Sequence, residues 1–371
     1  RRVHGKGNKL QLGILLCYDI ATRLISLMQN KDVQRLRQVL ASHLHTAHET
    51  VEAFADAPSS STEKVNFEDI ISLGDHLSKQ ATIVGMLWSG EPPEPKDVEE
   101  TMGAFFNALQ GILLLAHGSR VGAGHTLCSI INNSMKLIVD SSFKLMSETI
   151  ASCDSLNKPP ESVVHILVGE LWEACSGLKK IPRTNVTAIG RELAKLAISV
   201  KDVVREMGEV KAASSDVSDD VCSGDYELGE GLSPEEMKLT RLVAGVVGEV
   251  LAYMKELIRA ITTFSKHEGH CEDGEVLASM EKLLKLCQTL SHQMDELGAS
   301  VYPPQETDLM MIVVSKGYHI DLEIRNLVSV FGSSDSFGIA SKNLNGSLNA
   351  LEKELHTTNL QYKIHSLSVS N

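Results

Sequence analysis

Three segments of this chain carry apolar residues in an unbroken alternation of three and four positions. That spacing puts the apolar residues of each segment on one stripe of a helix, as in helices that pack nearly parallel or antiparallel. The stripes are Ile189, Leu193, Leu196, Val200, Val203, Met207 and Val210; Val243, Val247, Val250, Met254, Leu257, Ile261 and Phe264; and Val276, Met280, Leu283, Cys287, Leu290, Met294 and Leu297. Aromatic residues make up only 4% of the chain, which suits aliphatic cores between helices. The sequence therefore predicts an all-α protein.

An acidic segment, residues 214–232 (SSDVSDDVCSGDYELGEGL), separates the first stripe from the second. It holds six carboxylates, four Ser and three Gly, with no Lys or Arg. Such a segment cannot bury enough apolar surface to offset the entropy lost on ordering it. We therefore predict a flexible linker at 214–232 between two packed helical bundles, an N-terminal one at 31–213 and a C-terminal one at 233–358.

Apolar periodicity and boundary residues place the individual helices. They are expected at about 31–55, 67–88, 97–117, 124–150, 161–177 and 185–212 before the linker, and at about 234–266, 274–298, 306–331 and 338–356 after it. Asn66 is a plausible N-cap. Ser233-Pro234-Glu235-Glu236 matches a capping box, with Pro at the first helical position. The four helices after the linker predict a four-helix bundle for the second unit.

Charge, cysteines and hydropathy exclude several classes of protein. The net charge of −13 would repel phosphate backbones, so direct nucleic-acid binding is not expected. The seven cysteines are scattered and form no CxxC pair, which predicts free thiols in a reducing compartment. The longest apolar run, 104–117, has fourteen residues and includes Asn107 and Gln110, which is too short and too polar for a membrane span.

The first thirty residues differ from the rest of the chain. They carry five basic groups against one acidic group, followed at 10–18 by the apolar stretch LQLGILLCY. A signal peptide is disfavoured because no small-x-small cleavage site follows, and because Asp19 and Arg23 interrupt the run. We therefore treat 1–30 as an N-terminal extension, either an amphipathic helix or a poorly ordered segment.

Two short segments carry a resemblance to a known family. LWEACSGLKKIPRTN (171–185) and SVYPP (300–304) resemble matching segments of the cyclin-D-interacting protein family, and they occur in the same order around an acidic linker. The resemblance implies an all-helical protein without known catalytic activity, present in nucleus and cytoplasm. It also implies a role in restraining cell-cycle progression through binding of D-type cyclins and helix-loop-helix factors.

These segments also have a structural interpretation. Pro303-Pro304 should end the preceding helix near 298, with Tyr302 packing its ring against the corner. Trp172 is expected to be a core anchor rather than a partner-binding hot spot. The family is associated with a leucine zipper, and four residues here fall at heptad intervals. These residues, Val276, Leu283, Leu290 and Leu297, belong to the third stripe, so we expect them to be buried inside the bundle.

Motifs for specific chemistry are weak. The phosphate-loop-like GSRVGAGHT (118–126) lacks the Lys-Ser/Thr pair and follows a helix, so it predicts a helix–helix turn. No His has a Glu three residues before it, which argues against a di-iron bundle site. His43, His45 and His48 are expected on a solvated surface. Ser, His and Asp residues are present, but their spacing defines no triad.

One loop could hold a metal ion. His267, His270, Cys271, Glu272 and Asp273 crowd the connection between two predicted helices. Adjacent His and Cys are awkward as joint zinc ligands, and no second ligand pair exists. We therefore predict no catalytic, cofactor-binding or metal-ligating residues and no cofactor.

The sequence favours a non-enzymatic regulator that binds other proteins, resembling the cyclin-D-binding proteins. The alternative is a cytoskeletal or membrane-trafficking adaptor bundle of the vinculin kind, for which an exposed basic face would be the discriminating feature. A metal-dependent enzyme that uses the 267–273 loop is the third and weakest hypothesis.

The composition of the acidic segment generates the first prediction. Brief protease treatment should cut the chain within 214–232 before it cuts any helix, because exposed, flexible segments are the preferred sites of nicking. Mass spectrometry of the earliest fragments measures this. First cuts inside 240–264 would contradict the prediction.

Overall fold

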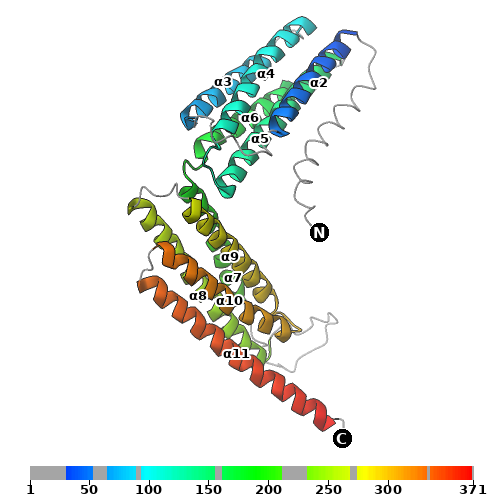
Figure 1. Cartoon of the computed structure of the whole chain (residues 1–371). Coiled ribbons are helices and arrows are strands. Elements are labelled where there is room, and N and C mark those ends of the chain that lie inside the picture. Colours follow the sequence, from blue (N-terminus) through cyan, green and yellow to red (C-terminus); the bar gives the residue numbers. More distant parts are fainter. Residues whose placement is uncertain are drawn as a thin grey trace, which may run out of the picture. The chain divides into compact units, whose positions relative to one another are not determined.

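The computed structural model describes residues 31–52, 65–88, 93–154, 161–210, 232–267, 274–331 and 335–369. It confirms the all-α prediction, and the chain divides into two compact units between Thr184 and Asn185 (Figure 1). The helices of the first unit are α2 (Lys31–Glu52), α3 (Phe67–Met86), α4 (Pro95–Gly118), α5 (His125–Asp154) and α6 (Glu161–Gly177), followed by the short 3₁₀ helix η2 (Leu178–Lys180). Those of the second are α7 (Asn185–Gly208), α8 (Pro234–His267), α9 (Gly274–Ala299), α10 (Thr307–Phe331) and α11 (Asp335–Val369).

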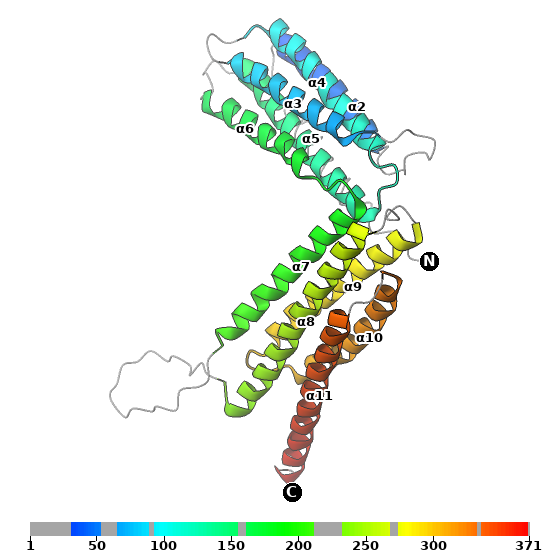
Figure 2. The same ribbon diagram turned by 90° about the vertical axis from the view of Figure 1, so that its left-hand side faces the viewer.

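In the first unit, α3 lies between α4 and α6, while α5 packs on α6 and α2 (Figure 2). Its core is aliphatic with a few phenylalanines, among them Ile70, Leu77, Phe105 and Ile112. Gly74 of α3 lies so close to η2 that a Cβ atom there would come within 2.5 Å of Leu178 Cδ1. The absence of a side chain at this position lets the end of α6 approach α3.

The segment 118–126 forms the turn between α4 and α5, as predicted. Gly122 adopts φ +74°, a left-handed conformation that residues with a Cβ atom rarely adopt. Gly122 therefore serves chain reversal, whereas a Cβ atom at Gly118 would come within 2.5 Å of Val65 Cγ2.

The second unit differs from the prediction because it also includes α7. The buried stripe of α7, with Leu193, Val200 and Val203, packs against α8 and α9. A Cβ atom at Gly298 of α9 would lie 2.7 Å from Val203 Cγ1 of α7, so α7 and α9 pack closely at this point. Within the described residues the second unit thus has five helices rather than four.

This packing moves the boundary between the units from the predicted linker to 184/185. The acidic segment connects α7 to α8, two helices of one unit. The N-terminal bundle predicted at 31–213 was wrong in its end, because a linker-like composition marks where a chain is polar and not which helices pack together. The N-terminal extension 1–30 and residues 214–231 of the acidic segment lie outside the described residues.

Local signals at helix starts are confirmed. Asn66 caps α3 by accepting a hydrogen bond from the Glu68 amide at 3.1 Å. At the start of α8, the Ser233 amide donates to Glu236 Oε2 at 2.9 Å, and the Glu236 amide donates to Ser233 Oγ at 3.2 Å. This reciprocal pair is the predicted capping box, which satisfies two amides that a helix start leaves without partners.

The prolines at 303–304 follow the end of α9 at Ala299, as predicted. Gln305 Nε2 lies 3.1 Å from both the Glu236 carbonyl and Thr240 Oγ1, which ties this corner to the first turns of α8. Tyr302 is 52% exposed at the corner, so its ring is only partly covered there.

Helix α11 is longer than predicted. It runs from Asp335 to Val369 rather than ending near 356. Buried residues recur along one of its faces from Phe337 to Leu355, and the helix continues to Val369.

The buried stripe of α8 generates the second prediction. Val250 is fully buried in the core of the second unit, so Val250→Asp should lower the free energy of unfolding by several kcal/mol, on the order of the whole stability of a marginal domain. Ala252→Asp, at an exposed position of the same helix, is the control and should change stability little. Thermal denaturation followed by circular dichroism measures both. Similar melting temperatures for the two variants would contradict burial of the stripe.

Candidate interaction surface

The segment 171–185 braces α6 and η2 against α3. The Trp172 indole Nε1 donates to the Ser78 carbonyl at 3.0 Å, and Lys179 Nζ lies 2.9 Å from Asp75 Oδ1. Arg183 Nη2 is 2.8 Å from Glu68 Oε1. From Trp172 to Arg183 the contacted residues of α3 run backwards from Ser78 to Glu68, so α6 and α3 are antiparallel. We call this line of contacts the seam.

Arg183 has a second contact that anchors this seam. Its guanidinium carbon lies 4.9 Å from the centroid of the Phe67 ring, a cation–π contact beside the Glu68 ion pair. Both ion pairs of the seam are largely exposed and therefore contribute little to stability. Their effect is to fix the register of the 171–185 segment on α3.

Trp172 is 47% exposed, so its prediction as a core anchor was wrong. The buried residues of α6 are Val164, Val168, Leu171, Ala174 and Cys175, and Trp172 stands at the edge of this face, over the seam with α3. The tryptophan that is buried is Trp88, at 3% exposure. Because α6 has apolar residues on several sides, its periodicity alone could not place Trp172.

Further exposed apolar side chains lie along the same two helices. A Cβ atom at Gly85 would lie 3.2 Å from Val168 Cγ2, so the end of α3 is beside the first half of α6. Ile83 and Met86 near the end of α3 are exposed, as is Ile166 on α6. Ile83 and Ile166 each stand two positions from a residue of the contact between the helices, Gly85 and Val168, so their side chains point away from it. We call Trp172 with its neighbours Ser78, Asp75 and Lys179 the α3/α6 face. It presents a half-exposed indole in a fixed setting, and tryptophan is a residue type that binding partners often contact.

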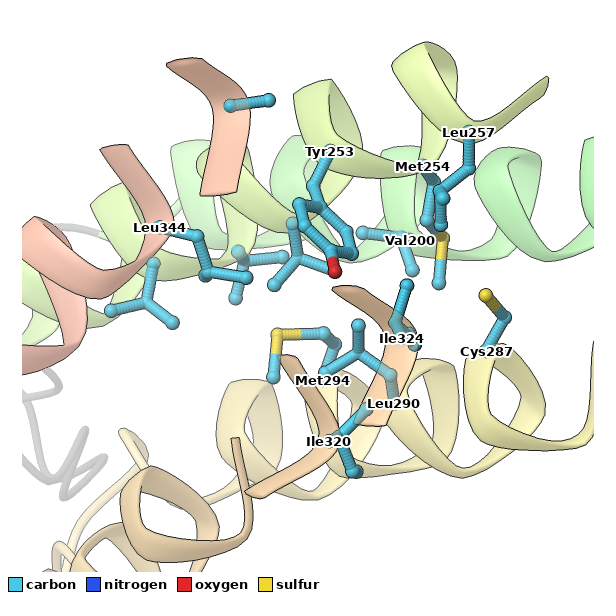
Figure 3. Packing of buried hydrophobic residues seen from close by; sticks show 14 of the residues in the cluster. Val200, Tyr253, Met254, Leu257, Cys287, Leu290, Met294, Ile320, Ile324 and Leu344 are labelled. Carbon is cyan, nitrogen blue, oxygen red and sulfur yellow. The ribbon is translucent and has the colours of Figure 1, made fainter. Parts of the chain in front are cut away.

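The heptad residues of α9 are not available for a zipper. Leu283, Leu290 and Leu297 are buried, and Val276 packs against the same core, as predicted. Figure 3 shows Leu290 and Met294 in one cluster with Tyr253 and Ile324. Pairing through these leucines would require opening the bundle.

The three histidines of α2 do not behave alike. His45 and His48 lie within ion-pair distance of Glu49 and Glu52, at 3.3 and 3.1 Å. His43 stacks on Phe106 with ring centroids 4.5 Å apart, and burial lowers its pKa. The expectation of a solvated surface was therefore wrong for His43, which is part of the α2/α4 contact.

Candidate chemical sites in the described residues are poor. The cavity beside His43 and Phe106 measures about 80 Å³, well below the roughly 300 Å³ at which small-molecule sites begin. Burial raises the pKa of Cys175 to about 11 and that of Cys287 to about 12, so both thiols stay protonated. Across the described ranges no three His, Cys, Asp or Glu residues are grouped as metal ligands. The candidate loop at 268–273 lies outside these ranges.

Comparison with known proteins identifies the family. The family model described as Grap2 and cyclin-D-interacting, N-terminal, matches residues 69–213, and its C-terminal counterpart matches 215–318. Together they match more than half of the chain. The chain belongs to the Grap2 and cyclin-D-interacting family.

Individual relatives in this family are distant in sequence. The chain is 23% identical over 234 residues to the cyclin-D1-binding protein 1 homolog of Xenopus laevis, covering 61% of this chain and 68% of that protein. It is 22% identical to the homolog of Danio rerio, covering 62% and 67%. It is 23% identical to cyclin-D1-binding protein 1 of Homo sapiens, covering 62% and 66%. The α3/α6 face falls within the N-terminal family model, whereas all of α11 lies beyond the C-terminal one.

No helix in the described ranges has the length and apolar character needed to cross a bilayer.

The exposure of Trp172 generates the third prediction. The chain has two tryptophans, so Trp88→Phe leaves fluorescence from Trp172 alone and Trp172→Phe leaves it from Trp88 alone. Acrylamide should quench the Trp172 emission several-fold more strongly, because that indole is half exposed and the other is buried. Trp172→Phe should cost only about 1 kcal/mol, since the Ser78 carbonyl still accepts from Thr82 Oγ1 at 2.9 Å. Equal quenching of the two variants would contradict the placement of Trp172.

Proposed function

We propose that this chain is a non-enzymatic regulator that acts by stoichiometric binding of a D-type cyclin. The observation that carries the proposal is membership of a family whose relatives are named for cyclin D1 binding. A negative effect on cell-cycle progression, helix-loop-helix factors as further partners, and a location in cytoplasm and nucleus belong to the same proposal.

The α3/α6 face is our proposed binding surface for the cyclin. Tryptophan is among the residues most enriched at binding hot spots, because it buries a large rigid surface while its N–H keeps a partner. Here the indole N–H is already satisfied by the Ser78 carbonyl. A partner could therefore cover the exposed part of the ring without leaving a buried donor unpaired.

The seam beside Trp172 supports this choice of surface. The Lys179–Asp75 and Arg183–Glu68 pairs hold the segment in place before binding. Less side-chain and backbone freedom is then lost on association.

Binding to a purified D-type cyclin, measured by biolayer interferometry, tests the proposal and is the fourth prediction. The full chain should bind, and Trp172→Ala should weaken binding about ten-fold or more with unchanged helical circular dichroism, as expected for a hot-spot truncation. Ile198→Ala removes an even more exposed apolar side chain from α7 in the other unit and should bind like the parent.

Two further outcomes separate the function from the surface. If the parent chain binds and Trp172→Ala binds equally well, the α3/α6 face is wrong while the function stands. If the parent chain does not bind any D-type cyclin, and purification from native cells yields cytoskeletal proteins instead, the adaptor hypothesis replaces the regulator. Leu283→Ala serves as a folding control, because its fully buried side chain should affect binding only together with helical content.

A further inference from the structure

The first half of α11 is a poor helix former. Half of the sixteen residues at 335–350 are Gly, Ser or Asn, all of which disfavour helix interiors. They are Ser336, Gly338, Ser341, Asn343, Asn345, Gly346, Ser347 and Asn349. The following residues, LEKELH at 351–356, are mostly strong helix formers. The first half therefore depends on tertiary contacts to be helical, whereas the second half has intrinsic support.

One buried carboxylate supplies the polar part of that contact. Asp321 of α10 is 1% exposed, and its Oδ1 accepts a hydrogen bond from Ser341 Oγ at 2.8 Å. Its Oδ2 accepts from Asn345 Nδ2 at 2.8 Å and lies 3.0 Å from Arg325 Nε. Two of the weak helix formers of α11 are thus the partners of Asp321. We call Asp321, Arg325, Ser341 and Asn345 the Asp321 node.

The node and the helix depend on each other. A buried carboxylate is tolerated only while donors compensate its lost hydration, and α11 provides two of the groups that do so, beside Arg325 and the nearby Tyr253 hydroxyl. Conversely, Ser341 and Asn345 are oriented toward α10 only while residues 335–350 are helical. Unfolding of the helix removes two donors from Asp321, and loss of these hydrogen bonds removes a tertiary contact that the helix needs. The contact between α10 and the first half of α11 should therefore form and separate as a unit.

This half of α11 buries four apolar residues in the core of the second unit, Phe337, Ala340, Leu344 and Leu348, and Phe337 lies beside Tyr253 of α8. The Tyr253 and Phe337 rings lie 5.1 Å apart, and Tyr253 is fully buried. Its hydroxyl lies beside Asp321, in a geometry short of an ordinary hydrogen bond, and burial, the charge of Asp321 and a hydrogen-bonding interaction with that carboxylate raise the pKa of Tyr253 far above the usual range. The phenol therefore sits neutral beside the node, and α11 covers it.

The second half of α11 is held by different contacts. Leu351 and Leu355 are buried, Glu354 lies 2.6 Å from Lys238 of α8, and Tyr318 of α10 donates to Glu352 at 3.3 Å. These interactions do not involve the Asp321 node, so they can hold residues from 351 onward while the first half separates.

We propose that residues 335–350 form a conditional helix, folded while docked on the Asp321 node and released as a unit when the node breaks. Release uncovers the surface of α8 and α10 around Tyr253, while α7 to α10 and the second half of α11 stay folded. The C-terminal unit therefore has two states. This inference is independent of cyclin binding.

Hydrogen exchange of the full chain, followed by mass spectrometry, tests the proposal. In the parent protein, peptides from 335–350 should exchange faster than peptides from 280–297 of α9, where strong helix formers predominate. Asp321→Asn keeps the size of the side chain but replaces an acceptor oxygen by a donor. It should speed exchange in 335–350 by about ten-fold or more, corresponding to the loss of a buried hydrogen bond. Asp308→Asn, at an exposed position of α10, is the matched control and should leave these rates unchanged.

A rescue variant distinguishes a conditional helix from ordinary core damage. Asn343→Ala, Gly346→Ala and Asn349→Ala all lie at exposed positions of α11, and a Cβ atom at Gly346 meets nothing within 4 Å. Combined, they raise helix propensity without touching the node, so they should restore slow exchange of 335–350 in the Asp321→Asn background. In the parent background they should slow exchange of this segment alone.

Three results would overturn the proposal. The first is parent protein in which 335–350 is as protected as 280–297. The second is faster exchange across the whole second unit in Asp321→Asn, which would make the node part of the general core. The third is a propensity variant that leaves exchange of 335–350 unchanged in the parent background, a measurement that does not require Asp321→Asn to fold.

Discussion

Burial of one apolar stripe per helix is the constraint on which both units depend. In α8 the stripe residues Val243, Val247 and Val250 are fully buried, and helices on several sides contact this one face and its flanks. Such stripes require close approach, which explains why Gly74 and Gly298 stand where a neighbouring side chain leaves no room for a Cβ atom. Cores of this kind are stabilised by buried apolar area and by close packing of complementary side chains, so most polar groups stay at the surface.

The Asp321 node is one exception to that rule. A carboxylate at 1% exposure would be strongly unfavourable without donors, and breaking a buried pair costs more than an apolar replacement would. A polar contact of this kind is specific in a way that aliphatic packing is not, because it is satisfied in one register of α11 on α10. It therefore fixes the position of residues 335–350 of α11, whose intrinsic helix propensity is low.

Local features of this fold were predictable from sequence, and features that depend on pairing between helices were not. The caps at Asn66 and Ser233 and the burial of the α9 stripe follow from residues within a few turns. The position of α7 does not, because its stripe fits any apolar partner face and only tertiary packing selects α8 and α9. Trp172 and Asp321 were missed for a related reason. Trp172 lies on an apolar helix without a clear polar side, and Asp321 precedes Arg325 by four positions, a spacing that also suits a surface ion pair.

The family models and the helix packing divide the chain at different positions. The family models meet near the acidic segment, at 213 and 215, whereas the structural units meet at 184/185. A fragment that ends at 213 carries α7 without α8 and α9, so Leu193, Val200 and Val203 would face water. Uncovering several fully buried aliphatic side chains costs about 1.5–3 kcal/mol each, comparable in sum to the stability of a domain. The N-terminal unit that folds by itself should therefore end before α7, with the Trp172 seam complete at Arg183.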